Sequence, residues 1–251
     1  NNFWQVFTGR EAIGGVSLKK ADDLFLYGEV LQGGASREDE YGKYIAVTAS
    51  NYGGILRSAI YARKLNAKGL SNWKNDAGAD RLVTWIESHD TYANKGESAA
   101  MKNFQLRAGY ALIAARSCGT PLFFNRPQGK EGVQFPKKSG TDEGVSKIGD
   151  IGNSEFMHAE VSAVNKFRTA MTGEDETLLN GSSLSVLVIK RGEKGAVIIN
   201  AAEKGAEKIA IPLALPDGTY TDAANGLKFK VKDGMLTGKE PHEKIAVVYE
   251  R

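Results

Sequence analysis

The sequence predicts an α/β fold in two parts: a parallel strand-and-helix part over residues 1–175 and an antiparallel β-sandwich over residues 176–251. In the first part, strand-like apolar runs alternate with amphipathic runs of helical spacing, which is typical of parallel strands joined by helical crossovers. In the second part, short strand-like runs follow one another with only turn sequences between them. That pattern is typical of a small antiparallel sandwich.

Four runs rich in β-branched and aromatic residues predict the strands of the first part. They are Leu24–Leu31, Tyr44–Ala49, Leu82–Ser88 and Thr120–Phe124. Apolar residues at helical spacing predict three helices, which are Gly54–Leu65, Phe104–Arg116 and Glu155–Met171. Four strand–helix units are half of an eight-stranded (β/α) barrel. We therefore expect half of a TIM barrel over residues 1–175.

Six short runs predict the strands of the second part. They are Leu184–Ile189, Gly195–Asn200, Lys208–Ile211, Gly218–Thr221, Leu227–Val231 and Ile245–Tyr249. Asn225-Gly226 and Asp233-Gly234 lie between such runs, and both dipeptides favour tight turns. The alternation of polar and apolar residues from Leu227 to Val231 predicts a strand with one buried face.

Composition narrows the class of protein. The 251 residues are 41% hydrophobic and 25% charged, which is ordinary for a globular chain. The 33 basic and 30 acidic residues are interspersed and give a net charge of +3, so nucleic acid and membranes are not expected partners. Phosphate-binding glycine loops, zinc-protease motifs and the serine-hydrolase elbow are absent from the sequence.

Two carboxylates, Glu29 and Asp90, are the candidate catalytic residues because each follows a strand-like apolar run. In strand–helix barrels, residues at the carboxyl ends of strands carry the chemistry. A structural interpretation stays open for each: Glu29 as a salt-bridged carboxylate, and Asp90 as a helix cap or turn residue. His89, directly before Asp90, favours the functional interpretation for the pair.

These motifs resemble those of the α-amylases of glycoside hydrolase family 13, most of all the secreted bacterial enzymes of the Bacillus subtilis type. The run from Tyr27 to Gln32 is similar to the fifth-strand motif of that family, and Glu87–Asp90 is similar to the seventh-strand motif. Glu29 and Asp90 are 61 residues apart, which fits. Cys118–Phe124 resembles the eighth-strand motif, and the predicted sandwich resembles domain C of the family.

The resemblance implies an endo-acting hydrolase of α-1,4-glucosidic bonds in starch and maltooligosaccharides, with retention at the anomeric carbon. Glu29 would be the general acid/base, and Asp90 would stabilise the transition state. His89, Leu31, Gln32 and Asn94 would bind substrate. The family also implies secretion and a structural calcium ion, with most calcium ligands expected outside this chain.

Two motifs of the family are absent: the Gly-x-Arg-x-Asp string that carries the nucleophile, and the earlier Asn-His pair. The resemblance therefore covers only barrel strands five to eight and domain C. We expect the isolated chain to be inactive without an N-terminal half, either a separate chain or a part removed by truncation. A non-catalytic glucan-binding or structural role remains the alternative, and transglycosylation in place of hydrolysis is a third interpretation.

Overall fold

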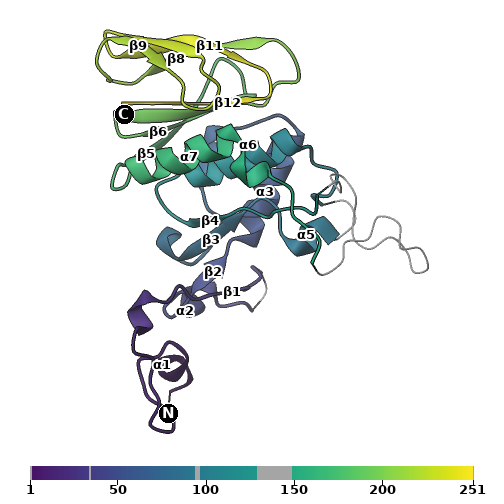
Figure 1. Cartoon of the computed structure of the whole chain (residues 1–251), viewed down its shortest axis with the longest axis vertical. Coiled ribbons are helices and arrows are strands. Elements are labelled where there is room, and N and C mark those ends of the chain that lie inside the picture. The colour runs from purple at the N-terminus through teal and green to yellow at the C-terminus, as the bar shows by residue number, and fades with distance from the viewer. Residues whose placement is uncertain (1, 34, 94–96, 129–148, 251) are drawn as a thin grey trace, which may run out of the picture.

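The computed structural model describes residues 2–33, 35–93, 97–128 and 149–250. Figure 1 shows the chain arranged along one long axis. The N-terminal segment and a parallel sheet lie at one end, a layer of helices lies in the middle, and two antiparallel sheets lie at the other end (Figure 1).

The parallel sheet has four strands in the order β1-β2-β3-β4. They are β1 (Tyr27–Gly28), β2 (Ala46–Thr48), β3 (Leu82–Trp85) and β4 (Thr120–Leu122). The predicted parallel pairing of these runs is confirmed, but every strand is shorter than predicted. The run from Leu24 to Leu31 forms only two strand residues, because β1 pairs with the short β2 alone and Leu24 and Phe25 remain exposed.

Strand β3 ends at Trp85, before the predicted Ser88, because the next residues start the helix α5 (His89–Ala93). The Ser88 N–H donates to Thr91 Oγ1 at 2.9 Å, and the Thr91 N–H donates to Ser88 Oγ at 3.3 Å. This reciprocal pair is a capping box, which satisfies amide groups at a helix start. Asp90 therefore lies in the first turn of a helix, and not at the tip of a strand.

Three longer helices form the middle layer: α3 (Ser50–Tyr61), α6 (Asn103–Ala115) and α7 (Ala159–Ala170). In Figure 1 they lie between the parallel sheet and the nearer antiparallel sheet. Helix α6 is buried almost all round, as its run of Ala, Leu, Ile and Gly residues requires. The shorter helices are α1 (Phe3–Phe7), α2 (Glu38–Gly42), α4 (Ala67–Ser71) and three single 3-10 turns at Ala21–Asp23, Ala79–Arg81 and Glu155–Met157. Within the described ranges, every helix is too short or too polar to cross a membrane.

The nearer antiparallel sheet has the order β12-β7-β6-β5, and its central strands β6 and β7 are buried on both faces. Its strands are β5 (Glu176–Asn180), β6 (Val186–Arg191), β7 (Gly195–Asn200) and β12 (Lys244–Tyr249). In β6, Leu187 and Ile189 pack with the helices, whereas Val186 and Val188 pack with the outer sheet. The two-residue period of a strand thus divides one apolar run between two cores.

The outer sheet has the order β8-β11-β10-β9. Its strands are β8 (Ala206–Pro212), β9 (Gly218–Thr221), β10 (Lys228–Lys232) and β11 (Met235–Pro241). The six predicted strands of this region are present with small shifts in their ends. Strands β5 and β11 were not predicted. Within β11, Gly238 lies under Phe229 of β10, since a Cβ at Gly238 would be 2.4 Å from the Phe229 ring.

Two arginines, one in helix α7 and one in the inner sheet, bond to the end of helix α6. Arg168 of α7 donates to the carbonyl oxygens of Ala114 and Arg116, at 3.2 and 2.7 Å. Arg191 of β6 donates to the carbonyl oxygens of Ala115 and Arg116, at 3.3 and 3.1 Å. The last carbonyls of a helix have no partner within the helix and favour nearby cations. These contacts fasten α6 to both α7 and the inner sheet.

Large apolar side chains are exposed around the N-terminal segment and β1. They are Phe3, Phe7, Ile13, Val16, Leu18, Leu24, Phe25, Tyr27 and Leu31. An apolar surface of this kind marks a place where other protein or a ligand binds. It lies at the end of the molecule occupied by the edge strand β1 (Figure 1).

Candidate functional site

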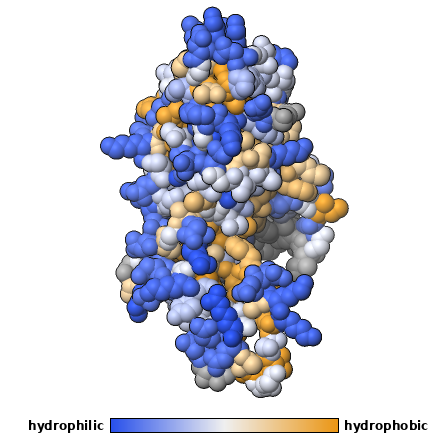
Figure 2. All heavy atoms as spheres, turned by 90° about the vertical axis from the view of Figure 1, so that its left-hand side faces the viewer, coloured by the Kyte–Doolittle hydropathy of each residue, from blue (hydrophilic) through white to orange (hydrophobic). Residues whose placement is uncertain are grey.

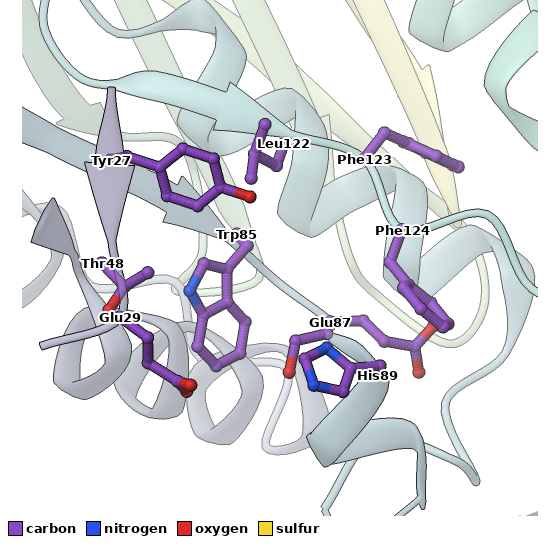
Figure 3. A pocket seen from close by; sticks show the side chains of 10 residues that line it. Tyr27, Glu29, Thr48, Trp85, Glu87, His89, Leu122, Phe123 and Phe124 are labelled. Atoms are coloured by element: carbon purple, nitrogen blue, oxygen red, sulfur yellow. The ribbon is translucent and has the colours of Figure 1, made fainter. Parts of the chain in front are cut away.

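A pocket of about 310 Å³ lies at the carboxyl ends of the four parallel strands (Figure 3). The last residues of β2, β3 and β4 line it, and so does the first residue after β1. These are Thr48, Trp85, Leu122 and Glu29; the other lining residues are Tyr27, Glu87, Ser88, His89, Phe123 and Phe124. In parallel α/β folds, ligands bind at this edge of the sheet. The pocket is therefore the candidate functional site.

Glu29 and His89 both line this pocket, although 60 positions separate them along the chain. Both side chains are exposed, and in Figure 3 the indole ring of Trp85 lies between them. Glu29 also lines a second pocket of about 470 Å³, together with Val30, Leu31 and neighbouring residues. Leu31 is 62% exposed there. Glu29 thus lies where the two pockets meet.

Asp90 lies beside His89 and does not line the pocket itself. Its Oδ1 is 3.4 Å from His89 Nε2, and the two side chains are 56% and 78% exposed. An exposed pair at this distance contributes little to stability. The backbone at the start of α5 therefore fixes where these two side chains lie.

Gln32 lines neither pocket, because backbone groups occupy its side-chain amide. Its Nε2 donates to the carbonyl oxygens of Val30 and Thr48, at 3.0 and 2.6 Å. Its Oε1 accepts from the Asn51 N–H at 2.8 Å. These bonds fasten the segment after Glu29 to the end of β2 and the start of α3. Asn94, the remaining predicted site residue, lies outside the described residues.

Glu87 is a second carboxylate in the pocket wall, but its charge is already paired. Arg126 Nε donates to Glu87 Oε2 at 2.8 Å, and one terminal nitrogen of Arg126 donates to Glu87 Oε1 at 2.7 Å. The Glu87 and Arg126 side chains are both 1% exposed. With both oxygens bound to a guanidinium, Glu87 is poorly suited to transfer a proton or attack a substrate. The sequence does not point to Arg126, because Glu87 and Arg126 are 39 positions apart and no local pattern links them.

Aromatic and aliphatic side chains make up the rest of the wall: Tyr27, Trp85, Leu122, Phe123 and Phe124. Aromatic faces offer apolar contact area with little loss of side-chain entropy. The pocket thus combines the exposed carboxylate of Glu29, a neighbouring His–Asp pair and an aromatic wall. This combination suits a neutral, hydroxyl-rich ligand whose bond is broken with the help of proton transfer.

Trp73 lies outside the pocket lining and has a packing role. The Arg116 guanidinium lies 3.7 Å from the centre of its ring, and Tyr52 packs against it at 4.9 Å between ring centres. Tyr92 is buried against Phe124.

The chain is similar over its whole length to two curated proteins named alpha-amylase. It is 39% identical over 255 residues to that of Butyrivibrio fibrisolvens, covering 94% of this chain and 25% of that protein. It is 33% identical over 253 residues to that of Clostridium acetobutylicum, covering 100% of this chain and 29% of that protein. The chain thus spans about a quarter of the length of these relatives. No protein-family model matches it.

Solved structures of the same kind share the fold. Alpha-amylase I of Eisenia fetida, in a complex with maltohexaose, superposes with a TM-score of 0.66 at 18% identity, over 90% of this chain and 53% of that one. An alpha-amylase of Anoxybacillus superposes with a TM-score of 0.65 at 18% identity, over 99% of this chain and 56% of that one.

Proposed function

This chain is homologous to a part of the alpha-amylases, and from that premise we propose that it contributes part of the active site of an enzyme that hydrolyses α-1,4-glucosidic bonds. The observation that carries the proposal is the meeting of Glu29 and His89 in one aromatic-walled pocket at the carboxyl ends of β1 to β4. The maltohexaose complex of the Eisenia fetida protein supports a maltooligosaccharide as the substrate.

In this proposal, Glu29 protonates the leaving glycosidic oxygen and then takes a proton from the incoming water. Its exposed position at the junction of two pockets supports that role, because a chain of sugars can occupy both sides of it. Asp90 accepts hydrogen bonds from sugar hydroxyls and favours a positively charged transition state. His89 and Leu31 contact the sugars. Gln32 positions the segment that follows Glu29, and Asn94 stays a prediction from the resemblance.

We further propose that β1 to β4 are barrel strands five to eight. In this proposal, residues 1–175 and 176–251 form two domains. The catalytic nucleophile then comes from outside this chain. A retaining mechanism needs a second carboxylate about 5–5.5 Å from the acid/base. The other carboxylate in the pocket lining, Glu87, is bound on both oxygens by Arg126. The exposed apolar surface beside β1 suits contact with the remaining half of a barrel. A partner of roughly half a barrel that co-purifies with this chain would support the split.

The structural calcium ion does not enter this mechanism. Calcium takes about six to eight oxygen ligands, and in the described ranges no three His, Cys, Asp or Glu side chains come together in a way that could bind a metal. Those residues do not fit the ion, so we assign it no step. Secretion likewise stays a prediction from the resemblance.

Replacing Glu29 tests the acid/base assignment. In the active form of the protein, Glu29→Gln keeps the shape of the side chain but cannot deliver a proton, so we expect kcat on maltooligosaccharides to fall by a factor of about 10²–10⁴ while glucan binding remains. Glu203→Gln is the matched control, since Glu203 is also exposed and lies in the sandwich. Retained hydrolysis by Glu29→Gln would remove Glu29 from this role.

A glucan-binding module without catalysis is the second candidate, and the paired state of Glu87 favours it, since no free second carboxylate lines the pocket in the described residues. This alternative predicts binding of maltooligosaccharides without turnover in every assembled form of the protein. It also predicts that binding survives Asp90→Asn. Turnover that depends on Glu29 would exclude it.

A further inference from the structure

The buried pair Glu87–Arg126 lies directly behind the candidate site. Glu87 lines the pocket two positions before His89, and Arg126 lies beyond the end of β4. Removing two charges from water costs several kcal/mol, and apolar side chains of similar size often stabilise a protein as well as such a pair does. The presence of the Glu87–Arg126 pair behind the pocket is therefore not explained by a contribution to stability.

Arg126 binds more than Glu87. Its two terminal nitrogens also donate to the carbonyl oxygens of Met101 and Ser98, at 3.0 and 2.7 Å. Its guanidinium lies 5.2 Å from the centre of the Tyr92 ring in α5. One planar group thus connects the end of β3, the helix α5 and the segment Glu97–Met101. Lysine could not replace it, because an ammonium group lacks this fixed fork of donors.

The same segment is bonded to the start of α5. Ser98 Oγ donates to Thr91 Oγ1 at 2.9 Å, and the Ser98 N–H donates to the Thr91 carbonyl oxygen at 3.1 Å. Thr91 in turn forms the capping box with Ser88. Contacts thus run from Glu87 through Arg126 and Ser98 to Thr91. They join the residues that come before and after His89 and Asp90 on the inner side of this turn.

We infer that Glu87 and Arg126 are positioning residues that fix the first turn of α5, and with it His89 and Asp90, against the substrate pocket. This inference rests on the proposed function for its reaction. His89 and Asp90 are exposed and only loosely paired with each other, so their backbone decides their position. A displacement of about 1 Å in a catalytic group costs on the order of 100-fold in rate.

The test compares Glu87→Gln and Arg126→Lys with a matched pair elsewhere. Arg116 and Glu176 form another arginine–glutamate pair with a buried guanidinium, and neither residue lines the pocket. In the active protein we expect Glu87→Gln and Arg126→Lys to lower kcat on maltooligosaccharides by about 100-fold with a smaller change in KM. Glu176→Gln and Arg116→Lys should leave kcat within a few-fold of the parent. This should hold even if their melting temperatures fall as much as those of Glu87→Gln and Arg126→Lys.

A second measurement does not depend on activity. NMR signals of the His89 imidazole, assigned by their loss in His89→Gln, should shift in Glu87→Gln and Arg126→Lys and stay in place in Arg116→Lys. Unmoved His89 signals, or full kcat in Arg126→Lys, would overturn the inference. Shifted signals in a protein whose parent neither binds nor hydrolyses glucan would support the positioning role and refute the proposed function, so the two failures are distinguishable.

Discussion

Carboxylates at three places in this chain have different surroundings, which decide what each group can do. Glu29 is exposed and lines the pocket. Glu87 is buried and paired with Arg126. Glu240, in β11, is buried, and among the described residues neither of its carboxyl oxygens has a hydrogen-bond partner. Burial raises the pKa of Glu240 well above its usual range, and the nearby Asp222 carboxylate raises this pKa further. The backbone amide of Ala246 lowers the pKa in part, although it does not meet hydrogen-bond geometry with the Glu240 carboxyl group.

Glu240 makes the stability of the protein depend on pH. At a pH below the pKa of glutamate in the unfolded chain, the Glu240 carboxyl group is neutral in both the folded and the unfolded state. It therefore destabilises the folded state least at such a pH. As the pH rises from there through the raised folded-state pKa, the unfolded state releases the proton more readily, so the free energy of unfolding falls. We expect Glu240→Gln to be more stable than the parent at pH 8 by about 1–3 kcal/mol and to differ little at pH 4.

Urea unfolding at the two pH values measures this effect. The control is Glu207→Gln, because Glu207 is the cross-strand neighbour of Glu240 in β8 but is only half-buried and accepts from Ser182 Oγ. Its free energy of unfolding should change little at either pH. A Glu240→Gln protein that loses as much stability as the parent between pH 4 and pH 8 would contradict the assignment.

Among the elements, helix α6 packs through a glycine against Ile86, the residue directly after β3. A Cβ at Gly109 would lie 2.4 Å from Ile86 Cγ1 and 2.6 Å from its Cδ1. Alanine favours helices over glycine by about 1 kcal/mol, but here it would force buried side chains apart. We expect Gly109→Ala to lower the free energy of unfolding by about 1–3 kcal/mol.

Gly69 in α4 is the matched control, since a Cβ there would meet nothing within 4 Å. Gly69→Ala should raise the free energy of unfolding by about 0.4–1 kcal/mol. Thermal unfolding of the two variants measures both effects. Equal effects of the two substitutions would mean that helix propensity, and not packing on Ile86, decides the result.

The sequence predicted elements well where the pattern was local. Strands β7 and β9 begin and end where expected, because apolar alternation and turn residues mark them. The runs predicted to end in the carboxylates Glu29 and Asp90 lie near each other, since Glu29 and His89 line one pocket, although Asp90 itself does not line it. Arg126 and the amide bonds of Gln32 were not predicted, because they depend on contacts with residues distant in the chain. Strand β1 is shorter than the predicted run Leu24–Leu31. The length of an edge strand depends on pairing with its neighbour, and not on the β-propensity of its residues alone.

On the scale of the whole molecule, the inner sheet belongs to two cores at once. One core joins residues of α3, α6 and α7 with one face of β6, β7 and β12, and the other fills the sandwich. The division at residue 175 therefore passes through a continuous apolar core. We expect one cooperative unfolding transition, with near-ultraviolet signals of Trp73 and far-ultraviolet strand signals changing at the same denaturant concentration.

A fragment of residues 176–251 gives a second test of the expectation that the whole chain unfolds in one transition. It would expose Leu187, Ile189, Val197 and Ile199 to water, and each costs about 1.5–3 kcal/mol when fully exposed. We expect the fragment to unfold at much lower denaturant than the same strands in the whole chain. Two separate transitions in the whole chain, with the second matching the fragment, would show that the parts fold independently.

The guanidinium groups at the end of α6 have a consequence for motion. Apolar surfaces tolerate sliding, since dispersion contacts lack direction, whereas hydrogen bonds weaken steeply when their angles change. Arg168 and Arg191 bond to neighbouring carbonyls from two different elements, so a swing of the inner sheet about α6 would break several bonds together. The sandwich is therefore held at one angle to the helices, and we expect any widening of the pocket to come from its own rim.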